Sequence, residues 1–262
     1  MTLEGKSVLV TGASEGIGAA CAAAFRQRGA KLTLTARNEA GLRAVAAGDD
    51  AVVAGDLTLE ATRRQTVEAA LDRHGGLDIL VNNAGVGLYA PTWLAPEADV
   101  RAMFELNFFA ALGMIRLAVP PMRERRGGLV VNISSIAGQV ALPWFTLYSA
   151  GKYAVNGLSD GLRMELRREG IGVMLVCPGY VKTGFQDHAL AGKPPARLRR
   201  SKKFAITPEQ CAEAIARGVE RDARTVVAPG AGRFLVGLSR LWPALAERML
   251  LSQYYQLDEE AA

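Results

Sequence analysis

A tyrosine and a lysine four positions apart are the residues of this sequence best suited to proton transfer. Tyr148 and Lys152 form a YxxxK pair at the start of a segment with helical periodicity. On a helix, this spacing places both side chains on one face with their Cβ atoms about 6 Å apart. A free tyrosine has a pKa of about 10, and a nearby ammonium lowers it by favouring the phenolate. Such a pair can give a proton to a carbonyl oxygen and take it back in the reverse reaction.

A serine upstream makes this interpretation more specific, since a YxxxK pair alone is also typical of two solvated side chains on a surface helix. Ser135 lies thirteen positions before Tyr148, at the end of the apolar run 129–134. Parallel α/β sheets bind ligands at the carboxyl ends of their strands, so a hydroxyl there can hold a substrate oxygen beside the tyrosine. Ser134 is the rival, but side chains alternate along a strand and its own points to the opposite face.

A glycine-rich segment at 11–18 follows the first apolar run and precedes an alanine-rich helical segment. Glycines allow a sharp turn that brings backbone N–H groups against a pyrophosphate at a helix N-terminus. The spacing is GxxxGxG, which differs from the GxGxxG of the general dinucleotide fingerprint, and a tight turn without ligand is the alternative. The predicted cofactor cradle consists of Gly12, Ser14, Glu15, Gly16, Ile17 and Gly18.

The end of the second predicted strand indicates which dinucleotide binds. A carboxylate about 20 residues beyond the glycine loop would bind the ribose of NAD, but the segment 35–38 has none. Arg37 can instead pair bidentately with a 2′-phosphate, which predicts NADP(H) in preference to NAD(H). Arg37 as a solvated surface residue is the alternative, and Glu15 stands where a second basic residue would favour NADP. Asp56 and Leu57, after the third strand, are expected to line the adenine pocket, with Asp56 accepting from the exocyclic amine.

The elements that must position these residues alternate regularly along the chain. Short β-branched apolar runs are separated by alanine-, leucine- and arginine-rich segments with helical spacing. This alternation predicts an α/β fold, a doubly wound Rossmann-type parallel sheet of about seven strands with helices on both faces. The strands are expected at 7–10, 31–35, 51–53, 77–81, 129–133, 172–176 and 225–228.

In combination, the motifs resemble those of the short-chain dehydrogenase/reductase family, in its compact single-domain branch. The resemblance covers about residues 5–230, with the motifs in the family's order and spacing. It is carried by the glycine loop 11–18, Asn82-Asn83-Ala84-Gly85, Asn107, Ser135, the Tyr148/Lys152 pair and Pro178-Gly179. One departure is Gly151, which replaces the more usual serine before the lysine and removes no catalytic atom.

The resemblance implies roles for specific residues. The implied catalytic set is Asn107, Ser135, Tyr148 and Lys152, in which Asn107 holds a water-linked proton path to Lys152. Tyr148 and Lys152 are also implied to contact the cofactor, Lys152 through ribose hydroxyls. The segment Asn83, Ala84 and Gly85 is implied to shape the sheet edge beside the cofactor. The nicotinamide carboxamide is implied to be bordered by Pro178, Gly179, Val181 and Thr183.

The expected activity is hydride transfer between NADP(H) and a small-molecule carbonyl or secondary alcohol. A catalytically silent NADP-binding regulator and an NAD-dependent alcohol dehydrogenase of the same family are the alternatives. Sugar-nucleotide epimerases share the YxxxK pair, but they need a larger C-terminal substrate domain than 262 residues provide. The resemblance also implies a homodimer or homotetramer, assembled through the long helices around 98–125 and 146–169.

We expect one oxidoreductase domain at 1–230, with a substrate loop at 180–206 and an amphipathic tail at 231–262. The loop contains five basic residues within 197–203, either a solvated edge or an attraction for an anionic substrate handle or membrane. Apolar residues at 234, 238, 241, 245 and 249 of the tail form one helical face, and Pro243 is expected to kink or restart the helix. Such a face most often packs on its own domain or a partner subunit, and less often caps a substrate pocket or contacts a membrane peripherally. Apolar loop and tail residues favour a hydrophobic substrate, such as a ketone, a 3-oxoacyl group or a steroid-like compound.

Composition excludes several other classes. The net charge is only +5 and no nucleic-acid reading module is present, which argues against a nucleic-acid partner. Three scattered cysteines and two histidines predict neither a disulfide framework nor a metal site, and they favour a reducing compartment. We find no signal peptide and no run of 18 uncharged apolar residues, so no membrane-spanning helix and a cytoplasmic location are expected.

Overall fold

A computed structural model describes residues 1–192 and 205–258, with side chains described up to residue 251. Its centre is a seven-stranded sheet in the order β3-β2-β1-β4-β5-β6-β7, and every neighbouring pair is parallel. The fold class predicted from the sequence is thereby confirmed, and no strand boundary differs from its predicted position by more than two residues. The strands are β1 (Ser7–Thr11), β2 (Lys31–Ala36), β3 (Ala51–Ala54), β4 (Ile79–Asn82), β5 (Gly128–Ile133), β6 (Ile171–Pro178) and β7 (Thr225–Ala228).

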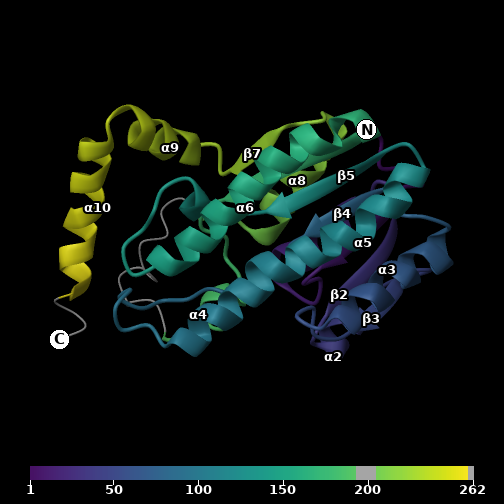
Figure 1. The fold of residues 1–262 in the computed structure, drawn as a ribbon, viewed down its shortest axis with the longest axis horizontal. Helices are drawn as coiled ribbons and strands as arrows, with labels where there is room; N and C mark the ends of the chain where they lie inside the picture. Colours follow the sequence, from purple (N-terminus) through teal and green to yellow (C-terminus); the bar gives the residue numbers. More distant parts are fainter. Residues whose placement is uncertain (193–204, 259–262) are drawn as a thin grey trace.

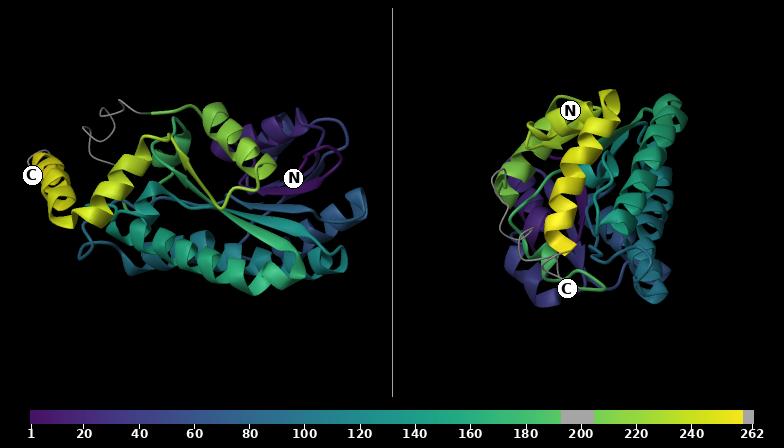
Figure 2. Two further views of the ribbon diagram at one scale, coloured as in Figure 1. Left: turned by 90° about the horizontal axis from the view of Figure 1, so that it is seen from above. Right: turned by 90° about the vertical axis from the view of Figure 1, so that its left-hand side faces the viewer.

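Helices cover both faces of this sheet, which lies between them as the middle layer (Figure 1, Figure 2). One face is covered by α1 (Gly16–Arg26), α2 (Glu39–Val45) and α8 (Pro208–Glu220). The other is covered by α3 (Glu60–His74), α5 (Ala111–Glu124) and α6 (Thr146–Glu165). The short α4 (Glu97–Phe104) runs into α5 through the π-helical turn Glu105–Ala110.

The central strands are mostly apolar, as expected for strands covered on both faces. In β1, Val8 and Val10 pack into the core beneath α1 and α8, whereas Leu9 packs into the core beneath α3 and α5. In β5, Val131 packs into the core beneath α1 and α8, and Val130 packs into the core beneath α3 and α5. Successive side chains of a strand point to opposite faces, so two separate hydrophobic cores hold one sheet.

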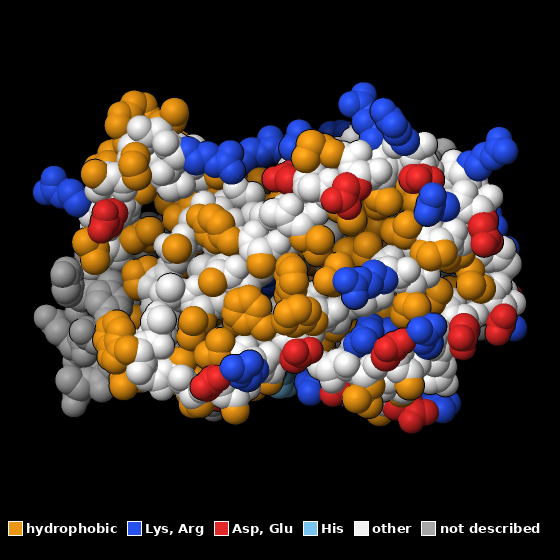
Figure 3. All heavy atoms as spheres, viewed as in Figure 1, with side chains coloured by type: hydrophobic (Ala, Val, Ile, Leu, Met, Phe, Trp, Pro, Cys, Tyr) orange, Lys and Arg blue, Asp and Glu red, His pale blue; other side chains and the backbone are white. Residues whose placement is uncertain are grey.

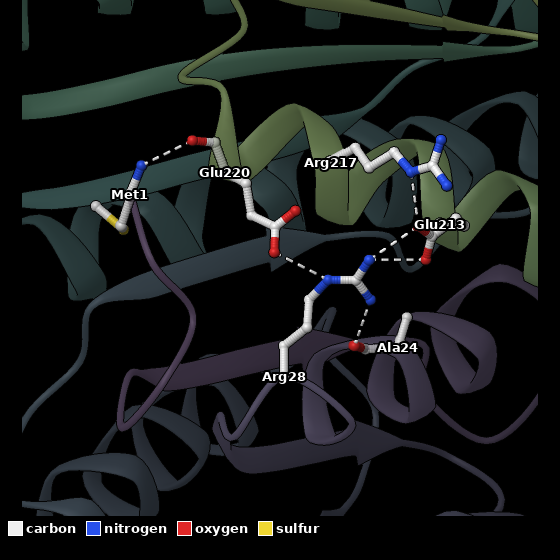
Figure 4. Close-up of polar contacts among 6 residues, drawn as sticks. All are labelled: Met1, Ala24, Arg28, Glu213, Arg217 and Glu220. Atoms are coloured by element: carbon white, nitrogen blue, oxygen red, sulfur yellow. Dashed lines mark hydrogen bonds and ion pairs between the residues drawn. The ribbon is translucent and has the colours of Figure 1, made fainter.

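Ion pairs and hydrogen bonds join the residues that follow α1 to α8 (Figure 4). The Arg28 guanidinium donates to both carboxylate oxygens of Glu213, at 2.9 and 2.8 Å, and to Glu220 at 3.0 Å. The Met1 ammonium donates to the carbonyl of Glu220, which brings the chain start to the same place. Hydrogen bonds from Arg28, and secondarily from Arg217, hold the pKa of the Glu213 carboxyl below its ordinary value.

The long helix Glu97–Glu124 differs from the expectation that no segment could span a membrane. An 18-residue window of this helix has a mean hydropathy of 1.5, so the helix is long and apolar enough to do so by length and composition, and a third of that window is buried in the fold. Met114, Ile115, Ala118 and Met122 form its inward stripe and pack on the sheet. Packing on the sheet therefore accounts for part of its apolar character.

The C-terminal segment forms two helices, α9 (Gly232–Leu241) and α10 (Pro243–Asp258), and α10 stands away from the sheet at one end of the molecule (Figure 1, Figure 2). Pro243 restarts the helix as predicted. Of the alternatives for the apolar stripe, packing on its own domain does not account for Phe234, Leu241, Leu245 and Met249, which are 47–75% exposed. The break before Pro243 divides the five positions between two helices. The basic run 197–203 lies outside the described residues.

Replacing Arg28 with methionine should lower the free energy of unfolding by about 1 kcal/mol at pH 7, because a bidentate, half-buried ion pair is lost. The Glu213 pKa is lowered in the folded state, so this stabilisation is present above the ordinary value of 4.5 and is lost as the pH falls through the folded-state pKa. Urea titrations of both proteins from pH 7 to pH 3 would measure the difference. Arg43→Met, which breaks an exposed pair with Glu39, is the control and should cost less than about 0.5 kcal/mol. An Arg28→Met effect that stays constant down to pH 3 would contradict this account.

Candidate active site

The loop between β1 and α1 requires glycine at the positions where its backbone is most tightly packed. Gly12 and Gly16 have φ angles of 63° and 57°, in the left-handed region that favours glycine. A Cβ at Gly18 would lie 2.1 Å from the Gly12 carbonyl oxygen, and a Cβ at Gly12 would lie 2.9 Å from the Cα of Ala84. The loop is therefore packed tightly against the residues that follow β4.

Hydrogen bonds from the end of β4 hold this loop in place. The Asn83 amide donates to the carbonyls of Thr11 and Gly12, at 2.8 and 3.1 Å. The Thr11 hydroxyl accepts from the backbone N–H groups of Asn83 and Ala84 and donates to Val81. Sequence reasoning assigned Asn83 and Ala84 to the cofactor edge but omitted Thr11, whose place in the glycine motif was the available signal.

The first turn of α1 is left open to an anion. It contains no acidic residue, and Glu15 at the N-cap makes no side-chain capping hydrogen bond. Backbone N–H groups at a helix N-terminus bind phosphate well, since the helix dipole favours negative charge there. Ile17 packs on the core beneath and anchors this turn. These features fit the predicted pyrophosphate cradle.

Arg37 lies at the same edge of the sheet as the glycine loop. It follows β2 directly and is exposed, with no ion pair among the described residues. The next helix begins close to the loop, because a Cβ at Gly41 would lie 3.0 Å from the Cβ of Ser14. A free guanidinium is thus available beside the loop.

The two residues predicted to line the adenine pocket, Asp56 and Leu57, lie in different environments. Asp56 directs one carboxylate oxygen back to its own loop, where it accepts from the backbone N–H and the hydroxyl of Thr58, both at 2.9 Å. Leu57 is 4% exposed and packs in the core with Val67 of α3. The structure therefore does not bring the Leu57 side chain to the cofactor edge, because the turn after β3 points it inward.

The segment after β6 lies against the glycine loop from the other side. A Cβ at Gly16 would lie 3.2 Å from Cγ2 of Thr183, and Glu15 pairs with His188 at 3.1 Å. Neither His188 nor this pairing was expected, because its two residues are 173 positions apart. The contact places the start of the predicted substrate loop over the cradle.

The other residues predicted beside the nicotinamide form the root of this loop. Pro178 ends β6, and the N–H of Gly179 donates to the Ala228 carbonyl of β7 at 2.7 Å. Val181 is buried and pairs with Ile206, which closes the loop at its base. The sheet edge therefore orders the root of the loop, including Thr183.

Tyr148 and Lys152 lie on the inner face of α6, and both are almost fully buried. The Lys152 ammonium donates to the carbonyl of Ile133 at 2.9 Å and lies 5.6 Å from the centre of the Tyr148 ring. Burial lowers the pKa of Lys152 to about 8. Burial also raises the pKa of Tyr148, and a hydrogen bond with Ser135 partly offsets that rise.

The two serines after β5 differ from the expectation, because Ser134 does not point away from the helix that carries Tyr148. Ser134 is buried and donates to the side-chain carbonyl of Asn156 at 2.6 Å, on α6. Ser135 is half-buried on the side of Tyr148, and its hydroxyl accepts from the N–H of Ala137 at 3.1 Å. Ser135 is thus the hydroxyl that meets Tyr148.

Asn107 lies in the π-helical turn between α4 and α5. Its side chain accepts from the N–H of Val86 and donates to the Val86 carbonyl, both at 2.8 Å. A Cβ at Gly85 would lie 3.0 Å from Asn107 Oδ1 and 3.7 Å from Lys152 Nζ, so these three residues adjoin. Single π-turns often occur at functional sites, and this one aims an amide into the loop after β4.

Aromatic rings enclose Tyr148. Phe145 lies between Tyr89 and Tyr148 and stacks on both, at centroid distances of 4.3 and 4.1 Å. Phe185 meets Tyr148 edge-on at 5.8 Å. Sequence reasoning missed this enclosure, because three separate loops contribute to it and no spacing links them.

A comparison with protein families matches residues 6–193 to the short chain dehydrogenase family. A dehydrogenase/reductase SDR family protein 7-like from Anopheles gambiae is 32% identical over 258 residues, which is 93% of this chain and 81% of the relative. A 3-ketodihydrosphingosine reductase from Bacteroides thetaiotaomicron is 36% identical over 181 residues, covering 69% of this chain and 66% of the relative.

Solved structures resemble the whole described fold. A short chain dehydrogenase/reductase from Burkholderia phymatum in complex with NAD has a TM-score of 0.86 at 26% identity, covering 94% of this chain and 96% of its own. A short chain dehydrogenase from Burkholderia cenocepacia in complex with NADP has a TM-score of 0.82 at 27% identity, covering 96% and 99%.

Proposed function

This chain belongs to the short chain dehydrogenase family, and we propose that it is an NADP(H)-dependent oxidoreductase that interconverts an apolar ketone and the corresponding secondary alcohol. The membership and the similar reductases support an oxidoreductase acting on CH–OH or keto groups. The observation that carries the proposal is the cluster of buried Tyr148 and Lys152 with half-buried Ser135 at the sheet edge. A regulator without chemistry would not need a lysine buried beside a tyrosine at this edge.

Each member of the cluster has a role that follows from its contacts. Ser135 is close enough to Tyr148 to lower the pKa of its phenol, and its hydroxyl is the group that would hold the substrate oxygen. Tyr148 is the group that gives its proton to that oxygen, and the Lys152 ammonium favours the phenolate left behind. When bound, the reduced nicotinamide supplies the hydride. Asn107 holds the loop after β4 against Lys152 and thereby keeps the ammonium in position.

Cofactor choice rests on Arg37. Its guanidinium is exposed at the sheet edge near the glycine loop and pairs with no described carboxylate. A doubly charged 2′-phosphate offers two oxygens that the planar guanidinium can bind bidentately. Similar structures bind NAD or NADP, so a nicotinamide dinucleotide is supported and the preference for NADP(H) is our proposal.

The apolar character of the substrate follows from the enclosure of Tyr148. Phe145 and Phe185 contact the tyrosine ring, and Leu88 and Met103 are buried in the same cluster. These apolar side chains favour a substrate with a hydrocarbon portion next to the reacting carbonyl, because binding then removes apolar surface from water. The name of the Bacteroides relative, a 3-ketodihydrosphingosine reductase, is consistent with a ketone.

Tyr148→Phe should lower kcat for ketone reduction at least 100-fold, because the proton donor is removed while the ring packing stays. Steady-state assays with NADPH and a series of aliphatic ketones would measure the loss, and fluorescence titration would show that NADPH still binds. Tyr153→Phe, on the exposed side of the same helix, is the matched control and should retain turnover. Residual turnover in Tyr148→Phe above a tenth of the wild-type value would reject the assignment.

Arg37→Asp should raise the Kd for NADPH at least tenfold, since a charge-assisted pair with the 2′-phosphate is replaced by repulsion. The Kd for NADH should fall or stay the same, because a carboxylate there can accept from the ribose hydroxyls. Fluorescence titrations with both cofactors give the two constants. Arg43→Asp makes the same change of charge on helix α2, two turns away, and should leave the NADPH affinity within about twofold. An unchanged ratio of the two affinities in Arg37→Asp would show that Arg37 is only a surface residue.

We also propose that the chain forms a homodimer or homotetramer through the outward faces of α5 and α6. Hydrophobic side chains gather over these helices (Figure 3), and Phe109, Tyr153 and Met164 are 46–74% exposed. Size-exclusion chromatography with light scattering should give a dimer or tetramer mass, and Met164→Glu should reduce it by placing a charge in the contact. A wild-type protein that elutes as a monomer at all concentrations would contradict the assembly.

A further inference from the structure

Three polar side chains form a connected group on the loops that cover Tyr148. The Tyr180 hydroxyl donates to the side-chain carbonyl of Gln186 at 3.2 Å, and the Gln186 amide donates to the hydroxyl of Tyr89 at 3.4 Å. Tyr89 comes from the loop after β4, whereas Tyr180 and Gln186 follow β6. We call Tyr89, Tyr180 and Gln186 the polar triad.

The hydroxyl of Tyr89 keeps a proton to donate. Tyr89 is only 7% exposed, and its hydroxyl accepts from Gln186 but donates to no residue within 1–192 or 205–258. Burial raises the pKa of Tyr89 to about 12, so this proton is retained at neutral pH. A buried donor without an acceptor is costly, which is why most such groups in folded proteins have a partner.

The triad is adjacent to the reacting site. Phe145 is sandwiched between the rings of Tyr89 and Tyr148, so one aromatic ring separates the two tyrosines. The two are also close enough for a charge on Tyr89 to raise the pKa of Tyr148. Apolar side chains, including Phe185 and Leu88, pack with Tyr148 in one hydrophobic cluster. The triad is therefore a polar group fixed at the edge of an apolar cluster.

An apolar site with one fixed donor discriminates between substrates in a particular way. A site built to hydrogen-bond a substrate group strongly rejects an analogue that lacks the group, because its own polar atom is then buried without a partner. An extra methylene in an apolar pocket produces much weaker discrimination. The hydroxyl of Tyr89 therefore favours a substrate that carries a hydrogen-bond acceptor. Aromatic side chains alone do not produce this preference.

We propose that the substrate is an apolar ketone with a second hydrogen-bond acceptor a few bonds from the reacting carbonyl, and that this acceptor binds the Tyr89 hydroxyl. Gln186 and Tyr180 hold that hydroxyl in its orientation. The inference rests on the proposed ketone chemistry and adds the chemical class of the substrate. In this proposal Tyr148 gives its proton to the reacting carbonyl oxygen, and Tyr89 donates a hydrogen bond to the second acceptor.

The test compares two probes of similar length, methyl 3-oxododecanoate and dodecan-3-one, which differ in the ester acceptor. The wild-type enzyme should have the higher kcat/KM for the oxo ester, and Tyr89→Phe should reduce the ratio of the two kcat/KM values at least about fivefold. The substitution keeps the ring that stacks on Phe145 and removes only the hydroxyl. Tyr153→Phe is the control and should leave the ratio unchanged, and thermal unfolding of each variant checks the fold.

A triad that merely holds the two loops together would lower kcat/KM for both probes alike, so an unchanged ratio in Tyr89→Phe overturns the inference. Binding of both probes to the enzyme with NADP⁺, measured by calorimetry, provides a second readout that needs no turnover. The oxo ester should bind more tightly, and Tyr89→Phe should remove that preference; equal affinities for wild type would also overturn it. If the oxo ester binds preferentially and neither probe is reduced, the proposed ketone chemistry fails and the acceptor site stands.

Discussion

All seven strands are parallel, so their carboxyl ends meet at one edge of the sheet, and every other feature of the site depends on this constraint. The strand order reverses direction between β1 and β4, and chains that turn away in opposite directions leave a crevice at that point. Asn83 and Thr11 span the two strands there by hydrogen bonds, which fixes the glycine loop against β4. Arg37, Ser135 and Thr183 reach the same edge only because β2, β5 and β6 end beside it.

Burial has opposite effects on the two titrating residues of α6. The same packing that holds the helix on the sheet raises the pKa of Tyr148 and lowers that of Lys152, which disfavours the charged form of each. A phenolate beside an ammonium reverses this preference, since each charge then stabilises the other. The Ile133 carbonyl at the end of β5 supplies the ammonium with an acceptor, so the buried charge costs less. The proton-transfer pair is thus held in a low dielectric, where its mutual interaction is strong.

Three loops cover this pair. Leu190 pairs with the loop after β4 through Gly87 and Tyr89, and Trp144 accepts from Ala90, so three loops meet over Tyr148. Tyr148 is 5% exposed in this arrangement. Burial under loops excludes water and strengthens the electrostatic interactions of the groups inside.

The sequence alone determined the sheet, the glycine loop and the pairing of Tyr148 with Lys152, because each depends on local periodicity or on residues within one turn of helix. It did not place Ser134, whose hydroxyl bonds to α6, because β5 ends at Ile133 and strand alternation does not extend beyond it. Tertiary structure alone decided the inward turn of Leu57, the exposure of the stripe on α9 and α10, and the contact of Glu15 with His188. It likewise assembled Tyr89, Phe145 and Phe185 around Tyr148 from three loops. Contacts between distant loops depend on how the elements between them pack, and no spacing within the chain encodes that packing.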